Sequence, residues 1–173
     1  MRATSQSVGF TSAMKIQTGI ITVSDRAFRG LYDDLGGPAL KTAVLACGWE
    51  VLDEVRVPDE KSDIQRAIRA QCAKGCQLIL TTGGTGVALR DVTPEAVREI
   101  ARRELPGFGE VMRSESLKLT PNAILSRCLA VVVDRTLIVS LPGKPKGAVD
   151  CLSFVTSAIP HCIKVLQEVP TSC

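Results

Sequence analysis

Apolar and amphipathic segments alternate along most of the chain. Short apolar runs are typical of strands, and stretches in which apolar side chains recur every three or four positions are typical of helices. Because the two kinds alternate, the sequence predicts a three-layer α/β sandwich, with a mostly parallel central sheet flanked by helices. The predicted strands are residues 19–24, 49–57, 78–81 and 136–141, and the predicted helices are residues 38–47, 62–74, 93–104, 108–118 and 146–167.

Glycine and proline mark the ends of several predicted elements. Pro38 enters the first helix and Gly48 stands just after its end, which is the usual placement of these two residue types. The apolar positions of residues 49–57 alternate only loosely, which is typical of an exposed edge strand. Pro160 lies inside the last helix and predicts a kink or a break there.

The length of the chain, 173 residues, fits one domain with a sizeable core. Residues 1–18 are rich in Ser, Thr and Gln and carry no apolar period, so we expect a flexible tail followed by a single domain over residues 19–173. The tail has few basic residues and no long apolar stretch, and it therefore makes a poor targeting signal. Seven cysteines, an odd number, favour small buried side chains in the reducing cytoplasm over a disulfide framework.

Composition and motifs exclude several classes of function. A net charge of +3 and an aromatic content of 3% do not suit a surface for nucleic acid. No uninterrupted apolar run approaches the length that spans a membrane. The single histidine, His161, falls off the apolar stripe of the last helix, and no G-x-S-x-G motif is present, so we do not expect a nucleophilic triad.

Residues 81–86 (TTGGTG) form a glycine-rich turn between a predicted strand and a predicted helix, of which Thr93 is the expected N-cap. At the end of a strand, glycine lets backbone N–H groups approach an anion without a Cβ in the way. The turn is neither a Walker A motif nor a dinucleotide fingerprint, because Gly86 is followed by Val and Ala and Leu89 stands where a last glycine is needed. By itself it leaves two interpretations open, a phosphate site and a structural turn.

Two aspartates lie beside helix starts for which other caps are available. An S-x-x-Q capping-box pattern at residues 62–65 follows Asp59, and Thr93 follows Asp91. Carboxylates left free near an anion-binding turn are candidate ligands for Mg²⁺, which joins one or two carboxylates to substrate phosphates. The alternative is that both are solvated loop acids or surface partners of Arg90.

Two further turns follow predicted strands. Residues 141–146 (LPGKPK) combine a glycine that allows close backbone approach with two lysines that attract phosphate, although Pro-Gly turns with surface lysines are also common. Residues 24–26 (SDR) end the first strand and precede an acidic loop, residues 30–37, which would accept hydrogen bonds from a base or a pterin, or be solvated. Since ligands of parallel sheets bind beyond the carboxyl ends of the strands, we expect these turns and residues 81–86 in one crevice.

As a set, these segments resemble the molybdopterin adenylyltransferase family of the MogA type, which is related to MoaB and to the G domain of gephyrin. The resemblance covers roughly residues 19–166 and is carried above all by TTGGTG followed by RDVTPEA and later by LPGKP. Two segments, PGFGE (residues 106–110) and AILSR (residues 123–127), favour the MogA type over MoaB. Further matching positions are residues 24–27, 38–40 and 58–60 with Gly30, Tyr32 and Asp34.

The resemblance implies the transfer of AMP from ATP to the phosphate of molybdopterin, with Mg²⁺ as cofactor and release of pyrophosphate. It implies Asp59 and Asp91 as catalytic residues and as ligands of the ion, with Arg90 and Lys144 offsetting charge. A cytoplasmic homotrimer and a downstream enzyme that inserts molybdenum are also implied, whereas nucleic acid and membranes are not expected as partners. The implied substrate-binding residues are Ser24, Asp25, Arg26, Gly83, Gly84, Thr85, Gly86, Arg90, Ser114, Glu115, Ser140, Pro142, Gly143, Lys144 and Pro145.

The attacking group in such a reaction is already an ionised phosphate. No strong base is needed, and catalysis can rest on alignment and charge neutralisation. A competing hypothesis is a non-catalytic molybdopterin-binding or carrier protein of the same pathway, similar to MoaB. The presence of both Asp59 and Asp91 argues against it.

Overall fold

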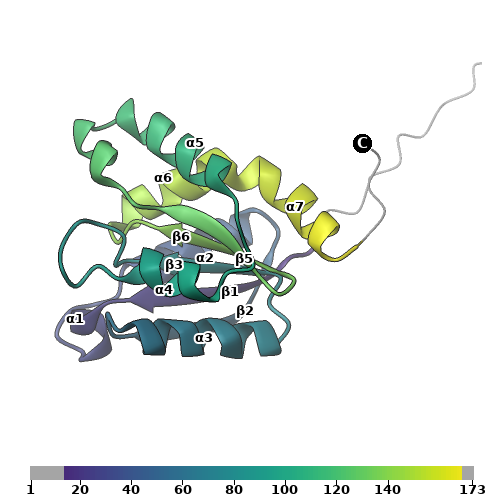
Figure 1. The fold of residues 1–173 in the computed structure, drawn as a ribbon, viewed down its shortest axis with the longest axis horizontal. Coiled ribbons are helices and arrows are strands. Elements are labelled where there is room, and N and C mark those ends of the chain that lie inside the picture. The colour runs from purple at the N-terminus through teal and green to yellow at the C-terminus, as the bar shows by residue number, and fades with distance from the viewer. Residues whose placement is uncertain (1–13, 169–173) are drawn as a thin grey trace, which may run out of the picture.

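The computed structural model describes residues 14–168 of the chain. In this part, a six-stranded sheet of order β2-β1-β3-β6-β5-β4 has helices on both faces (Figure 1). The first four strands of that order are parallel, and β5 and β4 are antiparallel to their neighbours, which confirms the predicted α/β sandwich. The strands are β1 (Gln17–Val23), β2 (Glu50–Val57), β3 (Leu78–Thr82), β4 (Arg103–Glu104), β5 (Leu129–Val133) and β6 (Thr136–Leu141).

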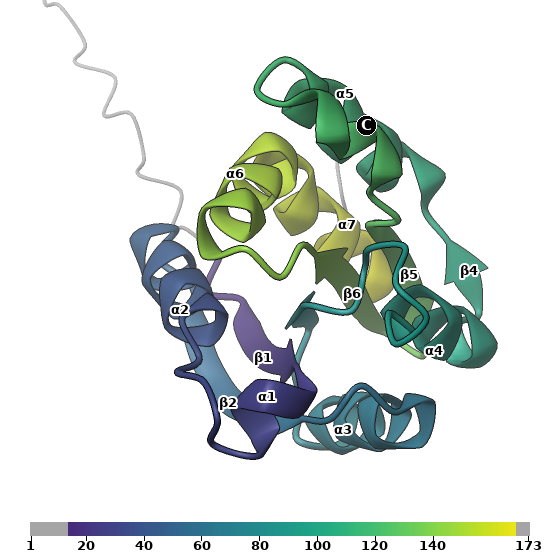
Figure 2. The same ribbon diagram turned by 90° about the vertical axis from the view of Figure 1, so that its left-hand side faces the viewer.

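The helices form the outer two layers. Helices α2, α6 and α7 cover one face of the sheet, with α5 packed on α6, and α3 and α4 cover the other face (Figure 2). The helices are α1 (Asp25–Phe28), α2 (Gly36–Ala46), α3 (Lys61–Ala73), α4 (Thr93–Ile100), α5 (Pro106–Leu117), α6 (Pro145–Val155) and α7 (Ile159–Leu166), with short 3-10 helices η1 (Pro121–Leu125) and η2 (Thr156–Ala158).

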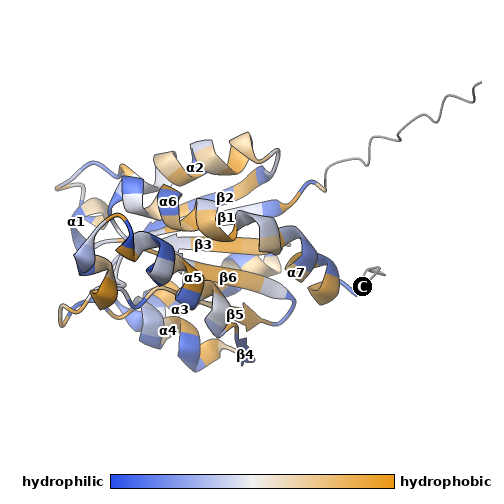
Figure 3. Ribbon diagram, turned by 90° about the horizontal axis from the view of Figure 1, so that it is seen from above, coloured by the Kyte–Doolittle hydropathy of each residue, from blue (hydrophilic) through white to orange (hydrophobic). Residues whose placement is uncertain are grey.

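Alternate side chains of the central strands supply two hydrophobic cores. On β3, Leu78 and Leu80 enter the core under α2 and α6, whereas Ile79 enters the core under α3 and α4. Both faces of the sheet are therefore buried, and the central strands read as continuous apolar runs (Figure 3). The packed sheet thus fixes the positions of the turns at its carboxyl edge.

Most predicted elements are present, with shifted ends. Strand β1 begins at Gln17, and Ile16 and Thr18 are fully buried, so the folded domain begins before residue 19 and the predicted tail boundary at residue 18 is wrong. The rest of that tail, residues 1–13, lies outside the described residues. The helix predicted over residues 93–104 ends at Ile100, and its last two residues pair with β5 as strand β4, which was not predicted.

Two predicted helix caps are wrong. Thr93 is the first residue of α4 and its hydroxyl donates to the Gly83 carbonyl oxygen instead of capping the helix. No side chain caps α3, because the helix begins at Lys61 and the expected cap Ser62 lies inside it, and Gln65 donates to Ala96 O and to Glu99 Oε2 on α4. The break expected near Pro160 is confirmed, since η2 separates α6 from α7.

The last helical stretch, Pro145–Leu166, is by length and composition the one described segment that could cross a membrane. Its apolar side chains, among them Leu152, Val155 and Ile159, are part of the core beneath α2.

Candidate functional site

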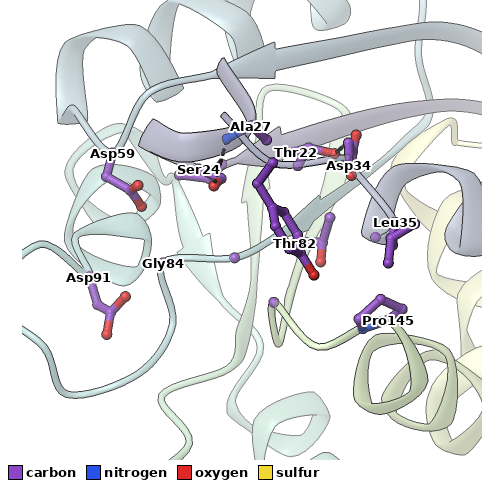
Figure 4. A pocket seen from close by; sticks show the side chains of 15 residues that line it. Thr22, Ser24, Ala27, Asp34, Leu35, Asp59, Thr82, Gly84, Asp91 and Pro145 are labelled. Carbon is purple, nitrogen blue, oxygen red and sulfur yellow. Dashed lines mark hydrogen bonds between the residues drawn. The ribbon is translucent and has the colours of Figure 1, made fainter. Parts of the chain in front are cut away.

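A crevice of about 270 Å³ opens at the carboxyl ends of β1, β3 and β6, the edge that Figure 2 views from the front. Turns that are far apart in the sequence meet at this crevice because each of these parallel strands ends at the same edge of the sheet. Seven of the residues predicted to form the site line it together (Figure 4): Ser24, Asp59, Gly83, Gly84, Asp91, Gly143 and Pro145.

The backbone of the β3–α4 turn requires glycine at two positions. Gly83 and Gly84 both have positive φ, 104° and 64°. A Cβ on Gly83 would lie 2.2 Å from Val23 O, and one on Gly84 would lie 2.4 Å from Thr93 Oγ1. Gly143 approaches from the third turn, where an added Cβ would be 3.3 Å from the Gly83 Cα. Glycine is therefore what allows the three turns to meet.

The same turn also presents donors. Gly83 N donates to Leu141 O, but within residues 14–168 the N–H groups of Gly84, Thr85 and Gly86 have no hydrogen-bond acceptor. Unpaired N–H groups at the end of a strand are suited to hold an anion. The two interpretations of the sequence are thus compatible, because a turn built for close packing leaves its N–H groups free.

Asp59 is held in place by Asp25. The Asp25 N–H donates to Asp59 Oδ2 at 2.7 Å, and the Asp59 N–H donates to Asp25 Oδ1 at 3.1 Å. The other oxygen, Asp59 Oδ1, faces Gly84, at 3.3 Å from where a Cβ on that residue would lie. Burial raises the pKa of Asp59, and the nearby carboxylates of Asp25 and Asp91 act in the same direction. A carboxylate in this situation favours a bound cation.

Asp91 is anchored in a similar way. Its Oδ2 accepts a hydrogen bond of 2.9 Å from the Ala88 N–H and packs close to Gly86. Its side chain lines the same crevice as that of Asp59, with Gly84 between them (Figure 4). Each aspartate thus has one oxygen fixed by a backbone N–H, and neither caps a helix.

Arg90 does not line the crevice. Its guanidinium group donates to both oxygens of Asp25, at 2.8 Å and 3.0 Å for Nη2, and to Glu60 Oε1 at 2.7 Å. The Arg90 side chain holds the pKa of Asp25 below its usual value. In this structure, Arg90 orients Asp25, which in turn binds Asp59, and the prediction that it faces substrate phosphates is not met.

Several other predicted substrate-binding residues lie outside the crevice. Ser140 is fully buried in β6 beside Thr81 and does not line the crevice. Ser114 and Glu115 are on α5, where their side chains bind Val111 O and Lys118. The other predicted residues that do not line the crevice, although they adjoin residues that do, are Asp25, Arg26, Thr85, Gly86, Pro142 and Lys144.

Lys144 is placed as the N-cap residue of α6. It is exposed and forms no ion pair with any residue of the described segment, whereas Lys146 is paired with Asp150. A positive charge at the rim of a crevice and at the start of a helix attracts anions.

Some crevice residues were not singled out from the sequence as ligands. Thr22 donates to Asp34 Oδ2 at 2.8 Å, and Gly37 N donates to Asp34 Oδ1 at 2.9 Å, so Asp34 is held rigidly at the end of the crevice opposite Asp59 (Figure 4). Tyr32 is half exposed on the lining, with the Arg26 guanidinium 5.2 Å from its ring centroid. The acidic loop of residues 30–37 was a sequence signal for Asp34. No signal marked Thr22 and Thr82, because both lie within apolar strands. The remaining lining residues are Val23, Ala27, Leu35, Gly36 and Thr82.

The donor set fits Mg²⁺ shared with a substrate better than a metal held by protein alone. Among residues 14–168 no three His, Cys, Asp or Glu side chains gather closely enough to hold an ion. Two carboxylates with free oxygens on one crevice do suit Mg²⁺, which takes its remaining ligands from phosphates and water.

A crevice built from glycine turns and helix starts at the carboxyl edge of a parallel sheet is typical of α/β proteins that bind phosphorylated ligands. The chain belongs to the family described as "Probable molybdopterin binding domain", whose model matches residues 19–161.

Similar proteins support this membership along nearly the whole chain. The molybdopterin adenylyltransferase of Helicobacter pylori is 44% identical over 87% of this chain and 88% of its own length, and that of Escherichia coli K12 is 41% identical over 88% and 86%. The solved structure of the molybdopterin biosynthesis enzyme MoaB from Thermus thermophilus is 44% identical, covers 91% of this chain and 99% of its own, and superposes with a TM-score of 0.84.

Proposed function

We propose that this protein is a molybdopterin adenylyltransferase. In this reaction an oxygen of the molybdopterin phosphate attacks the α-phosphorus of ATP, the bond from that phosphorus to the bridging oxygen breaks, and pyrophosphate leaves with the electron pair. The observation that carries the proposal is that Asp59 and Asp91, each fixed by one oxygen, line one crevice with the glycine turn. The relatives named molybdopterin adenylyltransferase match 87% and 88% of this chain.

The residues of this chain act by positioning and by charge. The free N–H group of Gly84, in the lining of the crevice, holds a phosphate oxygen, and Lys144 attracts the phosphates to the rim. Asp59 and Asp91 would hold Mg²⁺, which offsets the negative charge of the phosphates when it is bound. Because the attacking phosphate is already ionised, no residue has to remove a proton.

The proposed compartment, assembly state and downstream enzyme rest on the resemblance, on exposed apolar side chains and on the state of the cysteines. We expect the protein in the cytoplasm, as the resemblance implies. We also expect a homotrimer, because exposed apolar side chains that suit an interface continue from α5 into η1, among them Leu119 and Ile124. The six cysteines of the described residues are free, in keeping with a reducing compartment. An adenylylated pterin is an activated product, so an enzyme that inserts molybdenum is the expected consumer.

The test is pyrophosphate release from ATP, Mg²⁺ and molybdopterin by the full chain. Asp91→Asn keeps an oxygen that can accept from the Ala88 N–H but removes the charge, so turnover is expected to fall at least about a hundredfold while molybdopterin still binds. Asp150→Asn, which alters a surface pair on α6, is the matched control and should retain full turnover.

A carrier without catalytic activity is the second candidate, because the family to which the chain belongs is described by the binding of molybdopterin and not by a reaction. The same assay separates the two. Binding of molybdopterin by wild-type protein without any pyrophosphate release would refute the adenylyltransferase and leave the carrier.

A further inference from the structure

Arg127 ends the AILSR segment and has no assigned role. It lies between η1 and β5 and its side chain is 33% exposed, outside the lining of the crevice. It nevertheless contacts the loop that carries Asp91 at several points. Its Nε donates to Gly86 O at 2.7 Å, its Nη2 donates to Asp91 O at 2.5 Å, and its backbone N–H donates to Thr85 O at 3.0 Å.

The loop from Gly86 to Asp91 is held to the rest of the chain by the side chains of two arginines, Arg127 and Arg90, the second of which pairs with Asp25 and Glu60. The side chains of residues 87–90 are exposed, and Leu89 is fully so. Inside the loop, Asp91 N donates to Ala88 O, and Ala88 N donates to Asp91 Oδ2. The Asp91 carboxylate is therefore fixed to the loop, and its direction in the crevice depends on how the loop itself is held.

Arg127 is held in turn by α4. Its Nη1 pairs with Glu95 Oε1 in the first turn of that helix, and the same turn carries Thr93, whose hydroxyl donates to Gly83 O. The start of α4 thus fixes the glycine turn at one end directly and at the other end through Arg127. A planar guanidinium group can meet three acceptors in different fixed directions, whereas a lysine ammonium cannot reproduce that arrangement.

We propose that Arg127 is the positioning residue that holds the Gly86–Asp91 loop and so sets the Asp91 carboxylate against the phosphates in the crevice. This inference rests on the proposed function for its catalytic consequence but not for its structural one. Arg127 itself touches no substrate. Its removal should therefore impair kcat and the use of Mg²⁺ more than it impairs binding of molybdopterin.

The first measurement needs no substrate. Amide hydrogen exchange of the ligand-free full chain is compared for wild type, Arg127→Lys and Arg127→Met. Exchange at Ala88 and Asp91 is expected to speed up by about tenfold in both variants, with the rates in β1 and β3 unchanged. Arg113→Lys is the control, because Arg113 donates to a single backbone acceptor, Cys128 O, just after Arg127. Unchanged exchange at Ala88 and Asp91 in Arg127→Lys would overturn the proposal.

The second measurement is steady-state kinetics. In Arg127→Lys, kcat is expected to fall about 10- to 100-fold and the Mg²⁺ concentration for half-maximal rate to rise, while KM for molybdopterin changes little, as is usual when a group that orients a metal ligand is altered. Equal losses in Arg113→Lys, or full kcat with a loosened loop, would overturn it. If wild-type protein releases no pyrophosphate, the proposed function fails, and the exchange data still decide whether Arg127 holds the loop.

Discussion

Asp59 shows a conflict between stability and function at a single residue. Burial raises the pKa of Asp59, so between its ordinary value and the raised one the folded chain binds a proton that the unfolded chain has released. Its contribution to stability therefore falls as pH rises through this window, and above it the buried charge is a full cost. An acid kept at such a cost indicates a functional position.

We predict that Asp59→Asn is more stable than wild type at pH 7 and inactive. Asparagine keeps an oxygen for the Asp25 N–H but carries no charge. The gain, measured by urea unfolding, should shrink as pH falls from the raised pKa toward the ordinary one and be lost below about pH 4, where the wild-type group is protonated in both states. Asp134→Asn, at an exposed pair with Arg102, is the control and should shift stability by less than about 1 kcal/mol. A variant that is less stable at pH 7 would contradict the explanation.

Individual residues also show where sequence reasoning reaches its limit. The roles of Asp59 and Asp91 as crevice residues could be predicted, because each follows a recognisable strand or turn. The partners of the Arg127 side chain lie 32 to 41 residues earlier in the chain, and local patterns carry no information about them. Similarly, the resemblance implied that Arg90 offsets charge at the phosphates, but its partners in the structure come from α1 and from the residue before α3.

At the scale of elements, the central strands were predictable and the periphery was not. Strand β6 matches its predicted bounds because both its faces are buried and every residue is apolar or small. Strand β4 has only two exposed residues and exists through pairing with β5, so no periodicity marks it. The capping box predicted at residues 62–65 is absent because α3 begins at Lys61, before Ser62, and Gln65 contacts α4 instead.

The β3–α4 turn gives a prediction at this scale. Gly83→Ala should cost about 3 kcal/mol or more, because it adds a clash with the Val23 carbonyl to the strain of a positive φ. Gly30→Ala has a positive φ but open space around the new Cβ, so it should cost only about 1–2 kcal/mol. Urea unfolding of both variants checks this. Equal costs would mean that the turn can shift away from β1.

Gly84 is unsuitable as a probe of anion binding for a related reason. A side chain there meets Thr93 before it meets any ligand. Loss of ligand affinity in such a variant would therefore report a displaced α4.

For the whole molecule, the exposed apolar residues between α5 and β5 bear on assembly. Ile124 is 71% exposed, and Leu119, Leu125 and Val111 are exposed as well. If this surface joins the copies of a trimer, Ile124→Asp should convert the trimer to monomers in light scattering, because a charge in an apolar interface is costly. Leu52→Asp, on the edge strand β2, is the matched control and should leave the mass unchanged. A wild-type monomer would refute the trimer.

The cysteines report on the folded molecule as a unit. Burial raises the pKa of the Cys76 thiol to about 11 and also raises the pKa of Cys128 and Cys151. Since the thiolate is the reactive form, these three residues should resist iodoacetamide in the native protein at pH 8 and react quickly in urea. They lie in both cores, so their protection, followed by mass spectrometry, should be lost together over the same range of urea concentration. Earlier labelling of Cys76 alone would show that the layer of α3 and α4 opens separately from the layer of α2 and α6.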